Sequence, residues 1–349
     1  MSDPATTLTN EAATTRKRRS TAQRHVSRAL WYVRAGHVEL RIASLPPLAP
    51  NQARVRTQYS GISRGTERLI LSGAVPPGEY ERMRAPLQEG NFPFPVKYGY
   101  CAAGVVEDGP KELLGKPVFC LHPHQDVFHA AIDMLVPLPD GLPTRRATLA
   151  ANMETALNAL WDSAAGPGDT IVVVGAGILG LLVASLAATI PGTDVTVVDP
   201  ITERAALAAS LGAKFASPDN APTKADVVFH TSASAHGFNT AIACAGLEAA
   251  VIELSWYGEK TIPASLGGAF HSRRLKLISS QVGHVSPSHR PRWTYRRRLE
   301  KALHLLQNPL YDALVAEEIS FDDLPSRLPE VLAGTSTNLP PVIRYPAAN

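Results

Sequence analysis

This chain of 349 residues has few cysteines and a small net charge. Its three cysteines, Cys101, Cys120 and Cys244, have no C-x-x-C spacing and are too few for a disulfide framework. We therefore expect a reducing, cytoplasmic setting. The formal net charge of +3 is too small to indicate a nucleic-acid partner, and none is expected.

Long apolar runs are scarce as well, with one uncharged stretch at residues 171–190 that has the length of a membrane span. It contains three glycines and begins with β-branched residues. The first strand and helix of a parallel sheet are buried on most sides, so an uncharged run is expected there. We therefore predict no membrane partner.

Residues 1–27 lack any apolar run and are rich in Thr, Ala and Ser. Their basic cluster consists of Arg16, Lys17, Arg18 and Arg19. A secretory signal needs a hydrophobic core, so none is expected here. The composition predicts a disordered basic tail, while its Arg, Ser and Thr content leaves an organelle transit peptide as the alternative.

The chain does contain a glycine-rich turn between a β-branched run and an Ala/Leu-rich segment. The turn matches Gly-x-Gly-x-x-Gly, with the residues Gly175, Ala176, Gly177, Ile178, Leu179 and Gly180. The first glycine permits a tight turn, the second admits a pyrophosphate to a helix N-terminus, and the third allows close helix–strand packing. This pattern predicts a βαβ dinucleotide-binding site, with Thr231 and Ser232 beside the nicotinamide ribose.

The choice of cofactor depends on Asp199, which ends the next apolar strand. A carboxylate at this point accepts both adenosine ribose hydroxyls and repels a 2′-phosphate, so the sequence predicts NAD. Arg204, five positions further on, keeps NADP as the alternative.

The sequence pattern changes at residue 144. Before it, short apolar runs are separated by Pro and Gly; after it, the pattern predicts helices that alternate with single strands. The N-terminal half predicts a hairpin at 29–33 and 38–42, an alternating strand at 53–59 and a β-rich, barrel-like domain. The second half predicts a helix over 145–163, and parallel strands at 171–174, 195–199, 227–230, 251–254 and 275–280. After an amphipathic helix at 298–306, a last strand at 342–345 is expected to return to the N-terminal domain.

Several segments carry a family resemblance. They are the dinucleotide motif, residues 60–67 (Ser-Gly-Ile-Ser-Arg-Gly-Thr-Glu), 98–106 and 137–142. The chain resembles the medium-chain dehydrogenase/reductase superfamily of zinc alcohol dehydrogenases and quinone reductases. The resemblance implies an α/β fold with a β-rich GroES-like catalytic domain, residues 28–150 and 286–349, and a Rossmann domain with a doubly wound parallel sheet, residues 151–285. It also implies a homodimer in contact through residues 249–257 and 258–268.

The chain departs from the zinc-dependent members at the metal ligands. Those members carry Gly-Ile-Cys-Gly-Thr-Asp and Gly-His-Glu, whereas here Ser63 or Arg64 replaces the cysteine, and Tyr100 and Cys101 replace His and Glu. A catalytic zinc needs thiolate and imidazole ligands, so zinc is not expected. A rebuilt site would have to draw on Cys101, His122, His124 or Glu154, and surface or packing histidines are the favoured interpretation.

Without a metal, a hydroxyl or phenol must stabilise the charge on the substrate oxygen. The resemblance puts Tyr100 at the position of the zinc histidine, and Ser63 and Thr66 near the lost cysteine. These three residues are the predicted catalytic set, with Tyr100 first. Glu67 is interpreted as the structural partner of an arginine, and Cys101 as a small buried hydrophobic residue.

The leading hypothesis is a zinc-independent, NAD(P)(H)-dependent oxidoreductase acting on an alcohol, a carbonyl or an activated alkene of a small organic molecule. A non-catalytic dinucleotide-binding regulator is the alternative from another class. Local similarity of residues 60–69 and 71–73 to bacteriochlorophyllide hydroxyethyl dehydrogenases adds a pigment substrate as a further alternative. Arginines interleaved with aromatics at 290–298 are interpreted as a solvated or inter-subunit face rather than a nucleic-acid site.

Overall fold

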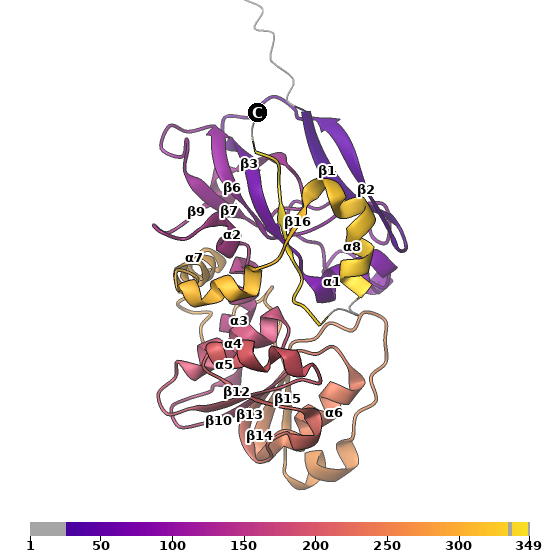
Figure 1. Ribbon diagram of the computed structural model, residues 1–349, viewed down its shortest axis with the longest axis vertical. Helices are drawn as coiled ribbons and strands as arrows, with labels where there is room; N and C mark the ends of the chain where they lie inside the picture. Colours follow the sequence, from indigo (N-terminus) through magenta and orange to yellow (C-terminus); the bar gives the residue numbers. More distant parts are fainter. Residues whose placement is uncertain (1–25, 334–336, 348–349) are drawn as a thin grey trace, which may run out of the picture.

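A computed structural model describes residues 26–333 and 337–347 of the chain. The predicted basic tail, including Arg16, Lys17, Arg18 and Arg19, lies outside the described residues apart from its last two positions. Those two, Val26 and Ser27, already belong to the first strand, β1. Two lobes follow one another along the long axis of the molecule (Figure 1).

The lower lobe in Figure 1 is built around a six-stranded parallel sheet. In spatial order its strands are β12 (Lys214–Ala216), β11 (Asp194–Val198), β10 (Thr170–Val174), β13 (Ala225–His230), β14 (Ala245–Glu253) and β15 (Lys276–Ser279). This order places the first strand of the lobe at the centre, as in a dinucleotide-binding sheet. The predicted parallel strands are confirmed, and the short strand β12 was not foreseen.

Helices cover both faces of this sheet. Ile171 and Val173 of β10 share one apolar core with Leu181 of helix α4 (Ile178–Ala188). The alternating residues Val172 and Val174 share another core with Phe238, which lies in helix α6 (Ala235–Cys244). Successive strand side chains point to opposite faces, so this division shows that the sheet is doubly wound, as predicted.

The upper lobe contains two further sheets (Figure 1). The four-stranded sheet has the order β2 (His37–Ser44), β1 (Val26–Arg34), β5 (Val96–Lys97) and β4 (Glu89–Gly90). The seven-stranded sheet has the order β16 (Glu318–Ser320), β17 (Val342–Arg344), β3 (Gln52–Gly61), β6 (Ala102–Asp108), β7 (Pro117–Cys120) and β9 (Val136–Pro137), with β8 (Val127–Ala131) also paired to β3.

The chain returns to the upper lobe at its C-terminal end, as predicted. Strand β17 pairs antiparallel with β3, with Ile343 opposite Ser60. Helix α8 (Leu324–Ala333) packs against β2 and against helix α1 (Arg64–Ser72). The seven-stranded sheet therefore combines strands from both ends of the chain.

The remaining helices lie in and around the lower lobe and its junction with the upper one. They are α2 (Thr144–Ala147), α3 (Ala150–Ser163), α5 (Ala205–Ser210) and α7 (Tyr295–Leu305), with short 3-10 or π segments at Pro77–Glu79, Ile132–Met134, Thr202–Arg204, Pro218–Asn220, Leu266–Phe270, Pro309–Val315 and Phe321–Asp323. The predicted single helix over 145–163 is wrong at its start, since α2 ends before α3 begins. Helix α3 packs against both α4 and α7, which joins the two lobes through a shared apolar core.

The predicted dimer contact at residues 249–257 begins on an inner strand. Strand β14 is bonded to β13 on one side and to β15 on the other, so its backbone hydrogen bonds are already used. The exposed edge of the sheet on this side is β15. Within the described ranges, no helix is long and apolar enough to cross a membrane.

Candidate functional site

A cleft of about 470 Å³ lies at the carboxyl ends of the parallel strands. Its walls come from the loops after β10, β11, β13 and β14, from the first turns of α1, and from Leu339 and Pro340. Ligands in such sheets bind outside the carboxyl ends of the strands, at the point where the strand order reverses. Here the order reverses between β10 and β13, and the loops after these strands both line the cleft.

Most of the predicted cofactor residues line this cleft. They are Gly175, Gly177, Ile178, Leu179, Asp199, Thr231 and Ser232. The two others, Ala176 and Gly180, are buried. The structure therefore brings this predicted set together at one end of the sheet.

The three glycines of the loop meet different surroundings. Gly175 has φ of +114°, and a Cβ there would lie 2.6 Å from Thr231 Oγ1. A Cβ on Gly180 would overlap the carbonyl oxygen of Gly175, so close packing needs glycine at this position. A Cβ on Gly177 would meet nothing within 4 Å, which leaves open space above the first turn of α4. That space, beside N–H groups without partners inside the helix, fits a pyrophosphate.

Asp199 is held rigidly at the end of β11. Its Oδ2 accepts a hydrogen bond from the Ala176 N–H (2.7 Å), and its Oδ1 accepts one from the Ile201 N–H (2.9 Å). Arg204 Nη1 lies 3.5 Å from Oδ2 of the same carboxylate. The acid predicted to select NAD therefore supports the glycine loop and is paired with a cation.

Arginines give this part of the cleft a positive charge. Arg64, Arg68 and Arg204 all line it. Burial lowers the pKa of Arg64, and the neighbouring charges of Arg204 and Arg68 lower it further. Nε of Arg64 is buried without a hydrogen-bond partner among the described residues, while its Nη2 donates to the carbonyl of Asn338 (2.9 Å). This charge distribution favours an anionic ligand.

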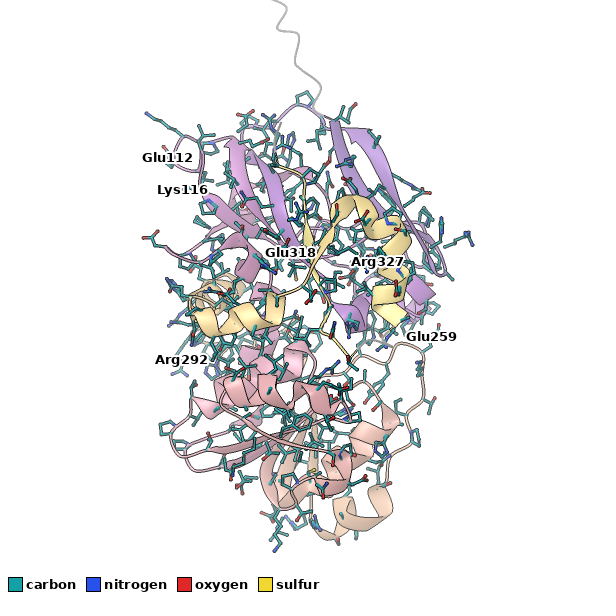
Figure 2. The ribbon with its side chains drawn as sticks, in the orientation of Figure 1. Glu112, Lys116, Glu259, Arg292, Glu318 and Arg327 are labelled. Carbon is teal, nitrogen blue, oxygen red and sulfur yellow. The ribbon has the colours of Figure 1, made fainter. Side chains whose placement is uncertain are left out.

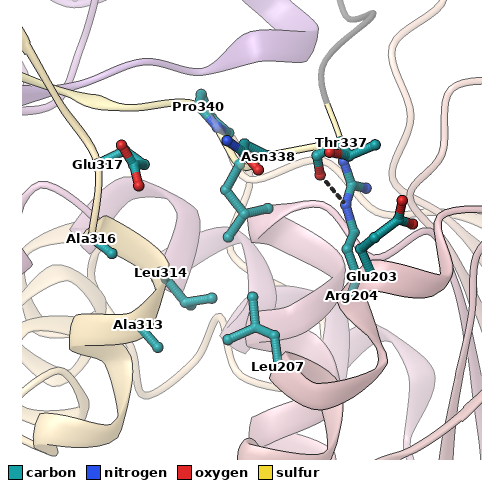
Figure 3. A pocket seen from close by; sticks show the side chains of 11 residues that line it. Glu203, Arg204, Leu207, Ala313, Leu314, Ala316, Glu317, Thr337, Asn338 and Pro340 are labelled. Carbon is teal, nitrogen blue, oxygen red and sulfur yellow. Dashed lines mark hydrogen bonds between the residues drawn. The ribbon is translucent and has the colours of Figure 1, made fainter.

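Arg204 also lines a second, smaller cavity of about 190 Å³. Figure 3 shows its Nε pointing at the carbonyl oxygen of Thr337, to which it donates a hydrogen bond of 3.1 Å. The apolar side of this cavity comes from Leu207 and Leu314. The arginine is therefore fixed from two sides, by Asp199 and by the C-terminal segment.

The three predicted catalytic residues lie close together at the start of α1. Tyr100 donates from its hydroxyl to Thr66 Oγ1 at 3.4 Å, and Ser63 immediately precedes the helix. Ser63 and Thr66 line the cleft, whereas Tyr100 is not among the residues that line it. Burial raises the pKa of Tyr100, with a further contribution from Cys101. Tyr100 therefore stays protonated near neutral pH and is available as a hydrogen-bond donor or acceptor.

The interpretation of Glu67 as the partner of an arginine is wrong. Its Oε2 accepts from the Tyr32 hydroxyl (2.8 Å) and lies 3.2 Å from His124 Nε2. Its Oε1 accepts from the Ser63 N–H (2.7 Å). The sequence could not reveal these partners, because Tyr32 and His124 are far from Glu67 along the chain and belong to other segments of the upper lobe.

The residues considered for a rebuilt metal site are engaged elsewhere. Glu154 accepts a hydrogen bond from Arg298 Nε (3.0 Å), and His124 contacts Glu67 and Ser60 Oγ (2.8 Å from Nδ1). His122 and His124 are both buried, so of the two interpretations, surface or packing, the packing one is correct.

Burial also acts against metal binding at Cys101, because it raises the pKa of the thiol and a metal binds the thiolate. Burial lowers the pKa of His122 to about 3, which keeps its imidazole neutral, and its Nδ1 lies 2.9 Å from the carbonyl oxygen of Pro123. In the part of the chain that the structure describes, no three His, Cys, Asp or Glu side chains group in a way that could hold a metal ion. These donors therefore do not fit a catalytic zinc.

The aromatic and basic segment at 290–298 is exposed or half-buried except at Arg298, in line with the surface face expected for it. Trp161 stacks on His289 (4.2 Å between ring centroids), and Arg297 lies over the ring of Trp293 (4.1 Å). Arg298 is 3% exposed, which corrects its assignment to a solvated face. Arg292 does lie at the surface (Figure 2).

The sequence did not reveal a chain of hydrogen bonds beside the cofactor loop. His230 and Glu253 end neighbouring strands and lie opposite each other in the sheet. Nδ1 of His230 is 2.8 Å from Glu253 Oε2, and Nε2 is 2.7 Å from Ser232 Oγ. The sequence did show that both residues stand at strand ends. It could not show that they face each other, because that depends on the pairing of β13 with β14.

Comparisons with known proteins agree with this architecture. No family model matches the chain. A zinc-type alcohol dehydrogenase-like protein of Haemophilus influenzae is 38% identical over 88 residues, a segment that spans 25% of this chain and 25% of that protein.

Solved structures match over nearly the whole chain. A protein of Sinorhizobium meliloti described as a zinc-binding dehydrogenase, bound to NADP, is 16% identical with a TM-score of 0.73, covering 92% of this chain and 99% of that one. An alcohol dehydrogenase of Escherichia coli CFT073 complexed with NADH is 13% identical with a TM-score of 0.71 over 92% and 99%. The 2R,3R-butanediol dehydrogenase of Bacillus subtilis is 18% identical with a TM-score of 0.72 over 92% and 100%.

The chain therefore has the two-domain fold of the medium-chain, zinc-type alcohol dehydrogenases. The fold expected from the resemblance, with GroES-like and Rossmann parts, is confirmed.

Proposed function

We propose that this protein is a zinc-independent, NAD(P)(H)-dependent oxidoreductase. It transfers a hydride to or from an alcohol or carbonyl, or to an activated alkene, of a small organic molecule. The observation that carries the proposal is the single cleft in which the glycine loop, Asp199 and the hydroxyls of Ser63 and Thr66 meet. The dehydrogenases of the same fold that are bound to NADP and NADH support it.

The cofactor is held by this chain's own backbone and charges. The first turn of α4 and the open space at Gly177 take the pyrophosphate, and Arg64 adds positive charge. Asp199 faces the adenosine ribose, with Thr231 and Ser232 at the nicotinamide end. When bound, the nicotinamide ring supplies the hydride acceptor or donor.

Hydroxyl groups take the role that zinc has in relatives with the metal ligands. Thr66 and Ser63 hydrogen-bond the substrate oxygen and stabilise the charge that develops on it. Tyr100 holds the Thr66 hydroxyl in place through its hydrogen bond. Because the three arginines leave the cleft positive, a substrate with an anionic group is favoured.

The experiment that tests this proposal is a two-stage assay. The purified protein is first titrated with NADH and with NADPH, and is then screened against alcohols, carbonyl compounds and enones. Saturable binding with turnover supports the oxidoreductase. Saturable binding without turnover across the panel supports the alternative, a dinucleotide-binding regulator.

We further propose a cytoplasmic homodimer, with the exposed edge at β15 as its contact. Leu277 on this strand is 47% exposed, and its neighbours on the edge carry unpaired backbone groups. Sedimentation velocity tests the assembly. A dimer that becomes a monomer on Leu277→Lys supports the contact, and a monomeric wild-type protein contradicts it.

A further inference from the structure

Three side chains beside the cofactor loop form a carboxylate–imidazole–hydroxyl chain. Glu253 Oε2 lies 2.8 Å from His230 Nδ1, and Ser232 Oγ lies 2.7 Å from His230 Nε2. The imidazole is fully buried, and the pairing of β13 with β14 fixes the carboxylate opposite it. The hydroxyl belongs to the loop directly after β13 and lines the cleft.

The carboxylate determines which nitrogen of His230 carries the proton. A carboxylate beside Nδ1 accepts a hydrogen bond and keeps the proton on that nitrogen. Nε2 is then an acceptor, and among the described residues its hydrogen-bond partner is Ser232 Oγ. The hydroxyl of Ser232 therefore donates to His230. Tyr257 reinforces this arrangement by donating from its hydroxyl to Glu253 Oε2 (3.1 Å).

Ser234 completes the hydrogen bonds around the Ser232 oxygen. Ser234 Oγ accepts the N–H of Gly237 (3.0 Å) and lies 3.0 Å from Ser232 Oγ. Because the Ser232 hydroxyl already donates its hydrogen bond to His230, Ser234 is the donor in the contact between the two serine hydroxyls. The Ser232 oxygen thus receives one hydrogen bond and has an acceptor for its own proton.

The oxygen also lies at the N-terminus of helix α6. A Cβ on Gly237, in the first turn of α6, would overlap Ser232 Oγ, so the glycine makes room for the hydroxyl. The positive end of the helix favours negative charge at this point. Charge developing on Ser232, or on an oxygen bonded to a carbon or phosphorus that it attacks, is stabilised there.

We propose that Ser232 is a nucleophile activated by His230 and Glu253, and that the cleft reacts with acyl or phosphonyl esters. The Ser232 oxygen forms a bond to the acyl carbon or to phosphorus, and its proton passes to His230 Nε2. The bond to the leaving group breaks, and His230 returns the proton to the departing alcohol. This activity needs no dinucleotide, so it stands independently of the oxidoreductase proposed above.

A fluorophosphonate probe tests the proposal on the full-length, cofactor-free protein. The phosphorus–fluorine bond breaks as the serine–phosphorus bond forms, and peptide mass spectrometry identifies the modified residue. We expect one label per chain, on Ser232, at a rate at least tenfold above that of the urea-unfolded protein. Ser232→Ala should abolish the label. Glu253→Gln, which keeps the size of the side chain, should slow labelling by about tenfold or more.

Thr240→Val is the matched control. Its hydroxyl lines the same cleft but donates to the carbonyl of His236 (3.0 Å) and has no imidazole contact in the described structure. Labelling should be unchanged in this variant. The proposal is overturned if the native protein is labelled no faster than the unfolded one, if the label maps to another residue, or if Ser232→Ala is labelled like the wild type. The first and second of these readouts use the wild-type protein and depend on no variant.

Discussion

Glu67 and His124 form a buried pair, with Oε2 of the carboxylate 3.2 Å from Nε2 of the imidazole. The two side chains are 1% and 0% exposed. Glu67 also accepts the N–H of Ser63, so the pair anchors the turn that presents Ser63 and Thr66 to the cleft. The hydroxyls that we propose for catalysis therefore depend on a carboxylate–imidazole pair in the interior of the upper lobe.

Removing the charge of Glu67 should destabilise the protein in a pH-dependent way. Burial raises the pKa of Glu67, but the charge of His124 and the hydrogen bonds from His124, Ser63 and Tyr32 outweigh burial and lower it below 4.5. A lowered carboxyl pKa contributes stability above its unfolded value, and this stability is lost as pH falls through the folded value.

The measurement is urea unfolding of wild type and Glu67→Gln between pH 3 and pH 7. At pH 7 we expect the variant to lose about 3 kcal/mol of unfolding free energy. The difference should shrink as pH falls below 4.5, where the carboxyl group of the unfolded chain becomes protonated before that of the folded protein. The exposed Glu112→Gln is the control (Figure 2). A difference that stays constant with pH would contradict the stabilising role of the ionised Glu67 carboxylate.

Alanine substitutions at two glycines of the same loop should affect different properties, cofactor binding in one case and stability in the other. Gly177 has open space and a φ of −74°, so Gly177→Ala should fold normally and weaken NADH binding by about tenfold or more. Gly180→Ala must displace the backbone of Gly175 and should cost about 1–3 kcal/mol of stability. Thermal melts and NADH titrations separate the two effects. Equal loss of stability in both variants would contradict this account of the loop.

Thr66 should matter more for turnover than Tyr100, because only Thr66 lines the cleft. Thr66→Val should lower kcat by about 100-fold with little change in KM for NADH. Tyr100→Phe removes only the supporting hydrogen bond and should lower kcat by about tenfold or less. Steady-state kinetics on a substrate from the screen measure both. A larger effect for Tyr100→Phe would support the expectation from the sequence that Tyr100 is the most important of the three predicted catalytic residues.

Arg204 should moderate the discrimination between the two dinucleotides. Its guanidinium lies 3.5 Å from Asp199 and reduces the repulsion between that carboxylate and a 2′-phosphate. Arg204→Ala should therefore weaken NADPH binding by about tenfold and change NADH binding much less. The exposed Arg292→Ala should change neither Kd. If both dinucleotides lose the same affinity, Arg204 acts on the pyrophosphate instead.

The sequence predicted the parts of this structure that depend on local order. The β-branched run before Gly175 and the strand ending at Asp199 pair as adjacent parallel strands. The last strand joins β3, in the N-terminal part of the chain to which it was expected to return. Alternation, glycine spacing and order along the chain contain this information, because neighbouring elements of a parallel sheet follow short-range rules.

The sequence could not predict contacts that depend on strand alignment or on distant partners. Glu67 was assigned to an arginine, but its partners Tyr32 and His124 come from other parts of the upper lobe. The contact of His230 with Glu253 required the pairing of β13 with β14. Asp199 was expected to face a ribose alone, whereas the fold also gives it two backbone donors and Arg204.

The most direct test of the central claim is a fluorescence titration of the wild-type protein with NADH and, separately, with NADPH. The account predicts saturable binding of NADH, tighter than that of NADPH, and its loss in Gly177→Ala at unchanged thermal stability. Failure of the folded wild-type protein to bind either dinucleotide would contradict the assignment of this cleft as a cofactor site.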